Sequence, residues 1–163
     1  MSIKRQVFYS FHYEKDVMRA AQIRNIGVVE GNKPVADNDW ETVKKGGEQA
    51  IKKWIDDNMN FRSCVIVLVG EDTANRKWVK YEIEKAWKDG KGLFGIYIHN
   101  IKDPRYGICY KGENPFSKFE FGNRNFSQIV KCYNPNPYDA YNDIANNIEK
   151  WIDEAIEIRE QYK

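Results

Sequence analysis

The sequence predicts an α/β protein whose helices cover both faces of a largely parallel sheet. Short runs rich in β-branched and aromatic residues alternate along the chain with segments of helical periodicity. One run, residues 63–70 (SCVIVLVG), is apolar almost without interruption, which is typical of a central parallel strand buried on both faces. The segments between successive strands are long enough for right-handed crossovers, so neighbouring strands are expected to run parallel.

The N-terminal part of the chain is predicted to hold two strands, two helices and a long loop. Residues 5–10 (RQVFYS) form the first strand, and residues 16–25 follow with helical periodicity. Residues 28–29 make a brief second strand, and residues 30–39, rich in Gly, Pro, Asn and Asp, form a turn-rich loop. The next helix presents one apolar face, formed by Ala50, Ile51, Trp54, Ile55 and Met59.

The segment after the central strand is predicted to continue the alternation and then to become irregular. A helix is expected over residues 76–89, with capping candidates in residues 72–75 (DTAN), and a fourth strand over residues 93–98 (LFGIYI). Scattered Pro, Gly and aromatic residues over 99–126 indicate a long excursion without regular structure. Residues 127–132 (SQIVKC) are expected to form a last, edge strand.

A long amphipathic helix is expected at the C-terminal end. Asp139 can cap its start, and its apolar face is formed by Ile144, Ile148, Trp151, Ile152, Ala155 and Ile158. The predicted architecture is therefore a single domain over residues 1–163 with a flavodoxin-like, three-layer fold and a mostly parallel five-stranded sheet in the order 2-1-3-4-5. Such sheets bind ligands at the carboxyl ends of their strands, which here directs attention to residues 10–16 and 70–84.

Composition narrows the class of protein. The 163 residues carry 26 Lys and Arg against 24 Asp and Glu, a net charge of +2, which argues against a nucleic-acid partner. No apolar stretch approaches the roughly 20 residues of a membrane-spanning helix, and the N-terminus does not resemble a signal peptide, so we expect a cytoplasmic protein without a membrane partner. Cys64, Cys109 and Cys132 are widely spaced, which predicts neither a disulfide framework nor a metal site, and Cys64 is expected to fill core volume.

Several familiar chemistries of this architecture lack their residues. The first strand ends in Tyr9 and Ser10 and the third in Gly70, so the acidic cluster of a phosphoryl-accepting receiver is missing. Neither Gly-x-Gly-x-x-Gly nor Gly-x-x-x-x-Gly-Lys-Ser/Thr occurs. Residues 11–13 (FHY) replace the small hydroxyl residues of a flavodoxin phosphate loop.

One constellation remains, over residues 75–84 (NRKWVKYEIE). Trp78 and Glu82 are four residues apart and share a helix face, so the indole and the carboxylate can form one wall of a pocket, with Glu82 at the margin of the buried stripe. A carboxylate held beside an aromatic ring can have a raised pKa and can stabilise positive charge in a transition state. The alternative is an ordinary amphipathic helix with solvated acids, which Glu84 fits better than Glu82 does.

These residues resemble a known family. Residues 7–11 (VFYSF) resemble the opening box of TIR domains, and residues 78–82 (WVKYE) resemble their Trp-Cys-x-x-Glu motif, with Val79 in place of the common Cys. Residues 31–34 (GNKP) replace the family's Arg-Asp-x-x-Pro-Gly element. A more specific similarity, to the bacterial and archaeal TIR-like group that includes the TIR proteins of Thoeris anti-phage defence, is carried by residues 39–41, 69–73 with 77–79, 95–103 and 112–116.

The resemblance implies an enzyme that cleaves the bond between nicotinamide and ribose in NAD⁺. In this group, cyclisation to a cyclic ADP-ribose isomer often follows, and the product acts as a messenger. Glu82 matches the family's catalytic Glu, and NAD⁺ is the substrate, with no other cofactor and no metal. The substrate-binding positions that we expect around it are Ser10, Phe11 and His12 on the nicotinamide and ribose side, Trp78 in the wall, Arg19 at the diphosphate, and Asp37 to Trp40 over the adenine or ribose.

Two other functions stay open at the level of sequence. The chain can be a non-catalytic TIR-like scaffold that signals by assembling with partners, or, less in keeping with the residues, an enzyme similar to nucleoside deoxyribosyltransferases. For the enzyme, the expected partners are further copies of the chain in a self-assembly, a phage-derived trigger, and a downstream effector reached through the diffusible nucleotide product.

Overall fold

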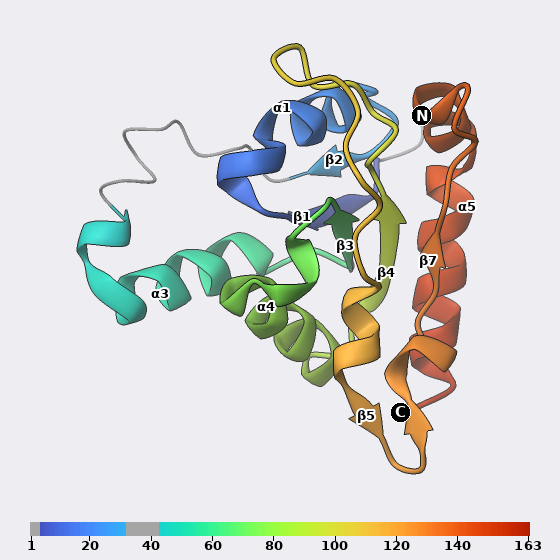
Figure 1. Ribbon diagram of the computed structural model, residues 1–163. Coiled ribbons are helices and arrows are strands. Elements are labelled where there is room, and N and C mark those ends of the chain that lie inside the picture. The colour runs from blue at the N-terminus through green and yellow to red at the C-terminus, as the bar shows by residue number, and fades with distance from the viewer. Residues whose placement is uncertain (1–3, 32–42) are drawn as a thin grey trace.

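A five-stranded, all-parallel sheet forms the centre of the molecule (Figure 1). The structure, a computed structural model, describes residues 4–31 and 43–163. The strands lie in the order β2-β1-β3-β4-β7. Their bounds are Glu30–Gly31 for β2, Gln6–Ser10 for β1, Cys64–Val69 for β3, Gly92–Tyr97 for β4 and Cys132–Tyr133 for β7. Because β7 is the fifth strand of this sheet along the chain, the predicted order 2-1-3-4-5 is confirmed.

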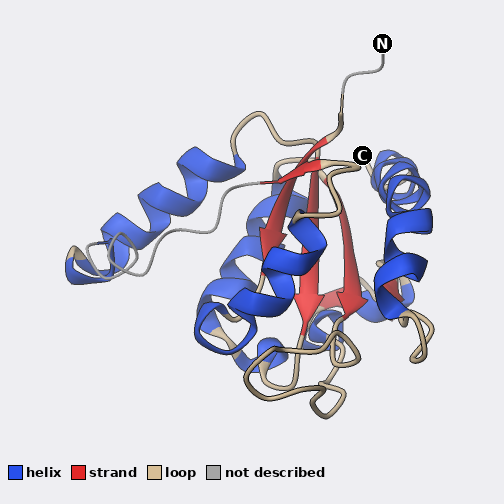
Figure 2. Ribbon diagram, turned by 90° about the horizontal axis from the view of Figure 1, so that it is seen from above, coloured by secondary structure: helices blue, strands red, loops and turns tan. Residues whose placement is uncertain are grey.

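Helices cover both faces of the sheet (Figure 2). Helices α1 (Tyr13–Arg24) and α5 (Ala140–Glu160) pack on one face, and α3 (Gly47–Met59) and α4 (Lys77–Lys88) pack on the other. The side chains of β3 alternate between the two cores: Ile66 and Leu68 face α1 and α5, whereas Val67 and Val69 face α3 and α4. The prediction that this apolar run forms a strand buried on both faces is therefore confirmed.

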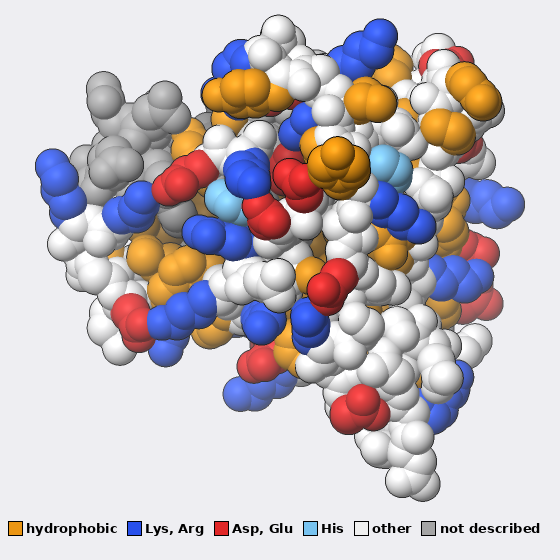
Figure 3. Space-filling model, in the orientation of Figure 1, with side chains coloured by type: hydrophobic (Ala, Val, Ile, Leu, Met, Phe, Trp, Pro, Cys, Tyr) orange, Lys and Arg blue, Asp and Glu red, His pale blue; other side chains and the backbone are white. Residues whose placement is uncertain are grey.

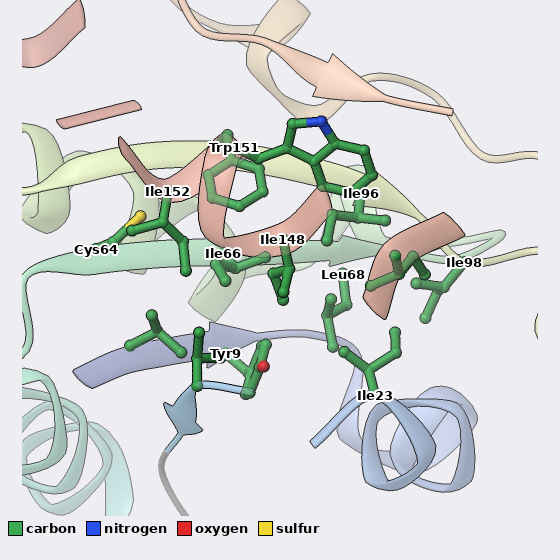
Figure 4. Packing of buried hydrophobic residues seen from close by; sticks show 14 of the residues in the cluster. Tyr9, Ile23, Cys64, Ile66, Leu68, Ile96, Ile98, Ile148, Trp151 and Ile152 are labelled. Atoms are coloured by element: carbon green, nitrogen blue, oxygen red, sulfur yellow. The ribbon is translucent and has the colours of Figure 1, made fainter. Parts of the chain in front are cut away.

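The core under α5 explains the regular spacing of apolar residues along this helix (Figure 4). Ile148, Trp151 and Ile152 of α5 lie over Ile66 and Ile96 of the sheet, in one buried cluster. Asp139 caps the helix by accepting a hydrogen bond from the backbone N–H of Asn142 at 3.4 Å. The predicted cap is confirmed, and so is the predicted apolar face except for Ile158, which packs against the other core. Cys64 fills core volume in the cluster under α5, as expected.

The first helix and the second strand differ from their predicted bounds. Helix α1 starts at Tyr13, three residues before the apolar periodicity begins, because its first turn is polar and half-exposed. The second strand is β2 at Glu30–Gly31, not residues 28–29, since Glu30 and Gly31 are the residues that pair with β1. Residues 32–39 of the predicted loop lie outside the described part of the chain.

The prediction of an edge strand over residues 127–132 is wrong for most of its length. Phe126–Gln128 form a 3-10 helix, η3, whose first residues are capped by Asn125, and only Cys132 and Tyr133 pair with β4. The excursion before it also contains regular structure that the sequence did not reveal. A 3-10 helix, η2 (Pro115–Lys118), leads into an antiparallel hairpin made of β5 (Glu120–Phe121) and β6 (Arg124–Asn125).

The turn between β3 and α4 is built differently from the predicted helix cap. Residues 73–75 form a short 3-10 helix, η1 (Thr73–Asn75), and none of their side chains caps α4. Thr73 Oγ1 instead accepts a hydrogen bond from the Gly70 backbone N–H at 2.7 Å, which closes the turn on the end of β3. Arg76 is the N-cap residue of α4 and offers no capping oxygen.

In the described ranges, 4–31 and 43–163, every helix is too short or too polar to cross a bilayer.

Candidate active site

Ser10 is the last residue of β1 and lies at the carboxyl end of the sheet. It shares strand parity with Phe8, so its side chain is directed to the face that α3 and α4 cover. In the sheet it pairs with Val67 of β3, which lies two residues before the end of that strand. Only 1% of Ser10 is exposed. The hydroxyl is thus held beneath α4 by the strand to which it belongs.

Glu82 of α4 meets this hydroxyl. Ser10 Oγ donates a hydrogen bond to Glu82 Oε1 at 2.8 Å, across 72 positions of sequence. Glu82 is 6% exposed, and its neighbours on the same helix face, Val79, Ile83 and Ala86, are core residues. Glu82 is therefore not at the margin of the apolar stripe but inside it, and the reading of this side chain as a solvated acid is wrong.

Burial dominates the electrostatics of Glu82. Loss of solvation raises its pKa to about 8, and the hydrogen bond from Ser10 opposes part of that rise. Within the described part of the chain, Oε2 has no hydrogen-bond partner. The site therefore holds a carboxyl group that ionises near neutral pH and has one oxygen available to a ligand. Perturbed acids of this kind are typical of functional sites.

Trp78 and Phe11, the aromatic residues predicted around the site, each pack against a tyrosine. Trp78 lies one turn before Glu82 and is half-buried, and its indole packs edge-to-face on Tyr81, with ring centroids 5.7 Å apart. Phe11 follows Ser10 and stacks on Tyr13, with centroids 6.3 Å apart. Both lie next to the Ser10–Glu82 pair in the chain, and their contact with a substrate stays a prediction.

His12 occupies the N-cap position of α1, two residues after Ser10. It is 7% exposed, and its backbone oxygen accepts the N–H of Asp16 at 2.8 Å. Burial and the positive charge of Arg76 lower the pKa of its ring. The imidazole is therefore neutral at physiological pH. His12 lies just beyond the carboxyl end of β1, the strand whose last residue, Ser10, binds Glu82.

Arg19, predicted at the diphosphate, is engaged inside the protein. Its Nη1 donates to Asp16 Oδ1, its Nε to the carbonyl of Ile101 and its Nη2 to the carbonyl of Gly107, each at 2.8 Å. Only 3% of Arg19 is exposed. These contacts favour a structural role, in which Arg19 ties α1 to the loop after β4, over contact with a substrate phosphate.

Asp16 is a second buried carboxylate that the sequence analysis did not single out. Its Oδ1 accepts from Arg19, and burial raises its pKa. A β-carbon built on Gly70 would lie 2.2 Å from Asp16 Oδ2, and one built on Gly112 would lie 2.0 Å from the Gly70 oxygen. Three segments thus meet at the end of β3 without room for a side chain on either glycine. A sequence pattern gives no sign of this, because the three segments are far apart in the chain.

Two of the predicted substrate-binding positions fall in a part of the chain that the structure does not describe. Asp37 and Trp40 lie outside the described residues, so their proximity to the site stays a prediction. Glu84 is exposed on the other side of α4, as expected of a solvated acid. His99 lies in the loop after β4, and its ring is edge-to-face with Tyr97.

The sheet order and the buried serine–glutamate pair between β1 and α4 are the features expected of a TIR-like domain. Residues 8–103, which include both members of the pair, match the family described as "Thoeris protein ThsB, TIR-like domain". The chain belongs to this family. It is also 33% identical over 148 residues to "Putative cyclic ADP-D-ribose synthase ThsB1" of Bacillus cereus (strain MSX-D12), an alignment that covers 86% of this chain and 77% of that protein.

Proposed function

We propose that this chain cleaves the nicotinamide–ribose bond of NAD⁺ and closes the remaining nucleotide into a cyclic ADP-ribose isomer, which serves as a messenger in anti-phage defence. The observation that carries the proposal is the buried hydrogen bond between Ser10 and Glu82 at the carboxyl end of the sheet. Family membership and the name of the Bacillus cereus relative support it.

The chemistry needs what this pair offers. When the bond between C1′ of the ribose and the pyridinium nitrogen breaks, its electron pair leaves with nicotinamide, which becomes neutral, and the ribose becomes an oxocarbenium-like cation. A carboxylate close to C1′ stabilises that cation or binds the ribose hydroxyls. Glu82 Oε2 is the oxygen available for this, since Oε1 is held by Ser10.

The raised pKa of Glu82 fits this role. In the free protein a pKa of about 8 leaves most of the side chain neutral at pH 7. A bound pyridinium ring brings a positive charge next to the carboxyl group, and a neighbouring positive charge lowers an acid's pKa. The substrate thus helps to form the carboxylate that the reaction needs. Ser10 fixes its orientation by holding one oxygen.

The second step decides the product. If water attacks C1′ and loses a proton, the product is ADP-ribose. If a nucleophilic atom elsewhere on the same nucleotide attacks and loses a proton, the product is cyclic and lighter by one water. Cyclisation requires only that the site hold that atom near C1′ and exclude water. No residue needs to enter the bond making.

Mass spectrometry of the products tests the proposal. Concentrated protein, and separately lysate from phage-infected cells that express it, is incubated with NAD⁺, alongside Glu82→Gln and the exposed control Glu84→Gln. We expect nicotinamide and the cyclic product from wild type and Glu84→Gln, and none from Glu82→Gln. Intact NAD⁺ under both conditions would instead support the non-catalytic scaffold. Equal activity of Glu82→Gln would exclude the role given to Glu82.

A further inference from the structure

The loop after β4, residues 99–112, presents apolar side chains to solvent. Tyr106, Ile108 and Tyr110 follow one another at alternate positions and are between 57% and 82% exposed. Figure 1 shows this loop, in yellow, rising above the helices at the carboxyl end of the sheet, and Figure 3 shows apolar and basic side chains along the same upper edge of the molecule. Exposed apolar side chains that gather in one place are typical of a surface that binds a partner.

The tip of this loop is held by a buried aspartate. The Asp103 carboxylate accepts hydrogen bonds from the backbone N–H of Arg105 at 2.7 Å, from its Nε at 3.2 Å and from its Nη2 at 3.1 Å. Asp103 and Gly107 exchange two backbone hydrogen bonds, at 2.9 and 2.8 Å, and Arg19 of α1 donates to the Gly107 carbonyl. The guanidinium of Arg105 lies over the ring of Tyr106, 5.0 Å from its centroid. The loop therefore presents its exposed side chains in a defined arrangement, which lowers the cost of ordering them in a complex.

The exposed charges of this loop are all positive. Lys102, Arg105 and Lys111 are exposed, whereas Asp103, which is the acidic residue of the loop, is buried and paired with Arg105. Neither Lys102 nor Lys111 forms an ion pair with any residue in the ranges 4–31 and 43–163. A partner with negative charges therefore complements this surface.

The acids of the segments that adjoin the loop are paired with other cations. Glu113 follows the loop directly and pairs with Lys118 at 2.8 Å. Glu71 and Asp72 belong to the turn after β3, which the loop contacts through Gly112, and both lie against Lys15. These acids therefore leave the charge of the loop available to a partner.

We propose that this surface docks the protein reversibly on an anionic lipid membrane. The surface, named here the β4 loop patch, consists of Lys102, Arg105, Tyr106, Ile108, Tyr110 and Lys111. At a bilayer surface, tyrosine rings lie at the level of the head groups, while Lys and Arg are attracted to anionic lipids. A projecting tip can bury its apolar side chains in the head-group region without a preformed cavity.

This mode of binding differs from the one that the sequence argued against. We expected no membrane partner because the apolar runs are too short to span a bilayer, and peripheral docking needs no spanning helix. The proposal is also independent of the proposed function, since it uses neither Ser10 nor Glu82.

Sedimentation with vesicles tests the proposal. The protein is mixed with vesicles of phosphatidylcholine alone, or of equal parts of phosphatidylcholine and phosphatidylglycerol, and the bound fraction gives a partition coefficient. We expect binding to the anionic vesicles only, and weaker binding as salt is added, because salt screens exposed charges. Lys111→Gln should lower the partition coefficient about fivefold, the loss expected for one basic side chain near an anionic surface. Tyr106→Ser combined with Ile108→Ser should lower it by at least about tenfold.

Two exposed residues at the opposite end of the sheet provide matched controls. Lys88→Gln removes the same charge at the end of α4, and Phe61→Asn removes an exposed aromatic ring shortly before β3. Asparagine suits position 61, where φ is 65°, because it tolerates a positive φ better than most residues. Both controls should bind anionic vesicles as wild type does.

Three results would each overturn the proposal: no binding of wild type to anionic vesicles, equal binding to neutral and anionic vesicles, or wild-type binding by the variants of the β4 loop patch. The first of these would favour an acidic protein surface as the partner, since the positive charge of the patch would still require a complement.

Discussion

Asp16 on α1 occupies the space where a side chain on Gly70 would lie. A β-carbon on Gly70 would come within 2.2 Å of Asp16 Oδ2 and 2.8 Å of Oδ1. Asp16 cannot turn away freely, because Arg19 holds its Oδ1 at 2.8 Å. This close approach packs α1, which follows Ser10, against the turn between β3 and α4, the helix that carries Glu82. It therefore sets how the two strand ends of the candidate site lie against each other.

Replacing Gly70 with alanine should destabilise the protein. The added methyl group forces the Asp16–Arg19 pair or the turn to move, and overpacking of this kind costs about 1–3 kcal/mol. Urea denaturation measures the loss. In an Asp16→Ala background the same substitution should cost clearly less, since the clashing carboxylate is gone. Equal costs in the two backgrounds would show that Asp16 is not the obstacle.

Loss of Arg19 should affect stability far more than substrate binding. Arg19→Met leaves Asp16 buried without its cation and breaks three hydrogen bonds, which is expected to cost about 3–5 kcal/mol. Arg19→Lys keeps the charge and should retain enough structure for kinetics, with a KM for NAD⁺ close to that of wild type. A KM raised tenfold in a stable Arg19→Lys protein would instead indicate contact with the substrate.

Ser10→Ala should move the pH dependence of catalysis upward. The hydrogen bond from Ser10 is the contact that lowers the pKa of Glu82 against the effect of burial. Bonds to charged groups contribute about 1.5–3 kcal/mol, so its removal should shift the acidic limb of the kcat/KM profile by at least about one pH unit. Ser63→Ala, at the opposite end of the sheet, is the matched control. If the acidic limb of the Ser10→Ala profile lies at the same pH as in wild type, the Ser10 hydroxyl does not affect the ionisation of Glu82.

Glu82 should make the wild-type protein less stable as the pH rises from about 4.5 to about 8. In the unfolded chain Glu82 ionises near its ordinary pKa of 4.5, whereas in the folded protein it keeps its proton up to about 8. The folded state therefore binds more protons in this window, and the free energy of unfolding falls by up to about 1.4 kcal/mol per pH unit from this group.

Urea denaturation at several pH values between 5 and 8 isolates this effect as the difference between wild type and Glu82→Gln. We expect Glu82→Gln to gain stability relative to wild type as the pH rises, and Glu84→Gln to follow wild type. Parallel curves for wild type and Glu82→Gln would mean that Glu82 ionises in the folded protein as it does in the unfolded chain.

The predictions that held are those that depend on local pattern. The apolar run of β3 and the periodicity of α5 follow directly from burial on two faces and on one face. The two-residue strands β2 and β7 are too short to carry a pattern of their own, and their position depends on which residues the neighbouring strand reaches. The hairpin formed by β5 and β6 was missed for the same reason.

The candidate site likewise combines residues that the sequence pattern located with contacts that only the fold reveals. The motif located Glu82 and the end of β1 located Ser10, but their hydrogen bond joins residues 72 positions apart, so only the fold reveals that Glu82 is buried. Arg19 could not be placed from the sequence either, because its bonds to the carbonyl groups of Ile101 and Gly107 join α1 to the loop after β4, more than 80 residues away.

Single-turnover release of nicotinamide tests the central claim most directly. Excess protein is mixed with NAD⁺ at pH 8, where wild-type Glu82 is about half ionised, and release is followed for wild type, Glu82→Gln and Glu84→Gln. We expect Glu82→Gln to be slower by at least a hundredfold, because the amide keeps the shape but cannot supply negative charge, and Glu84→Gln to match wild type. Release by Glu82→Gln within threefold of the wild-type rate would contradict the assignment of Glu82 to the cleavage of NAD⁺.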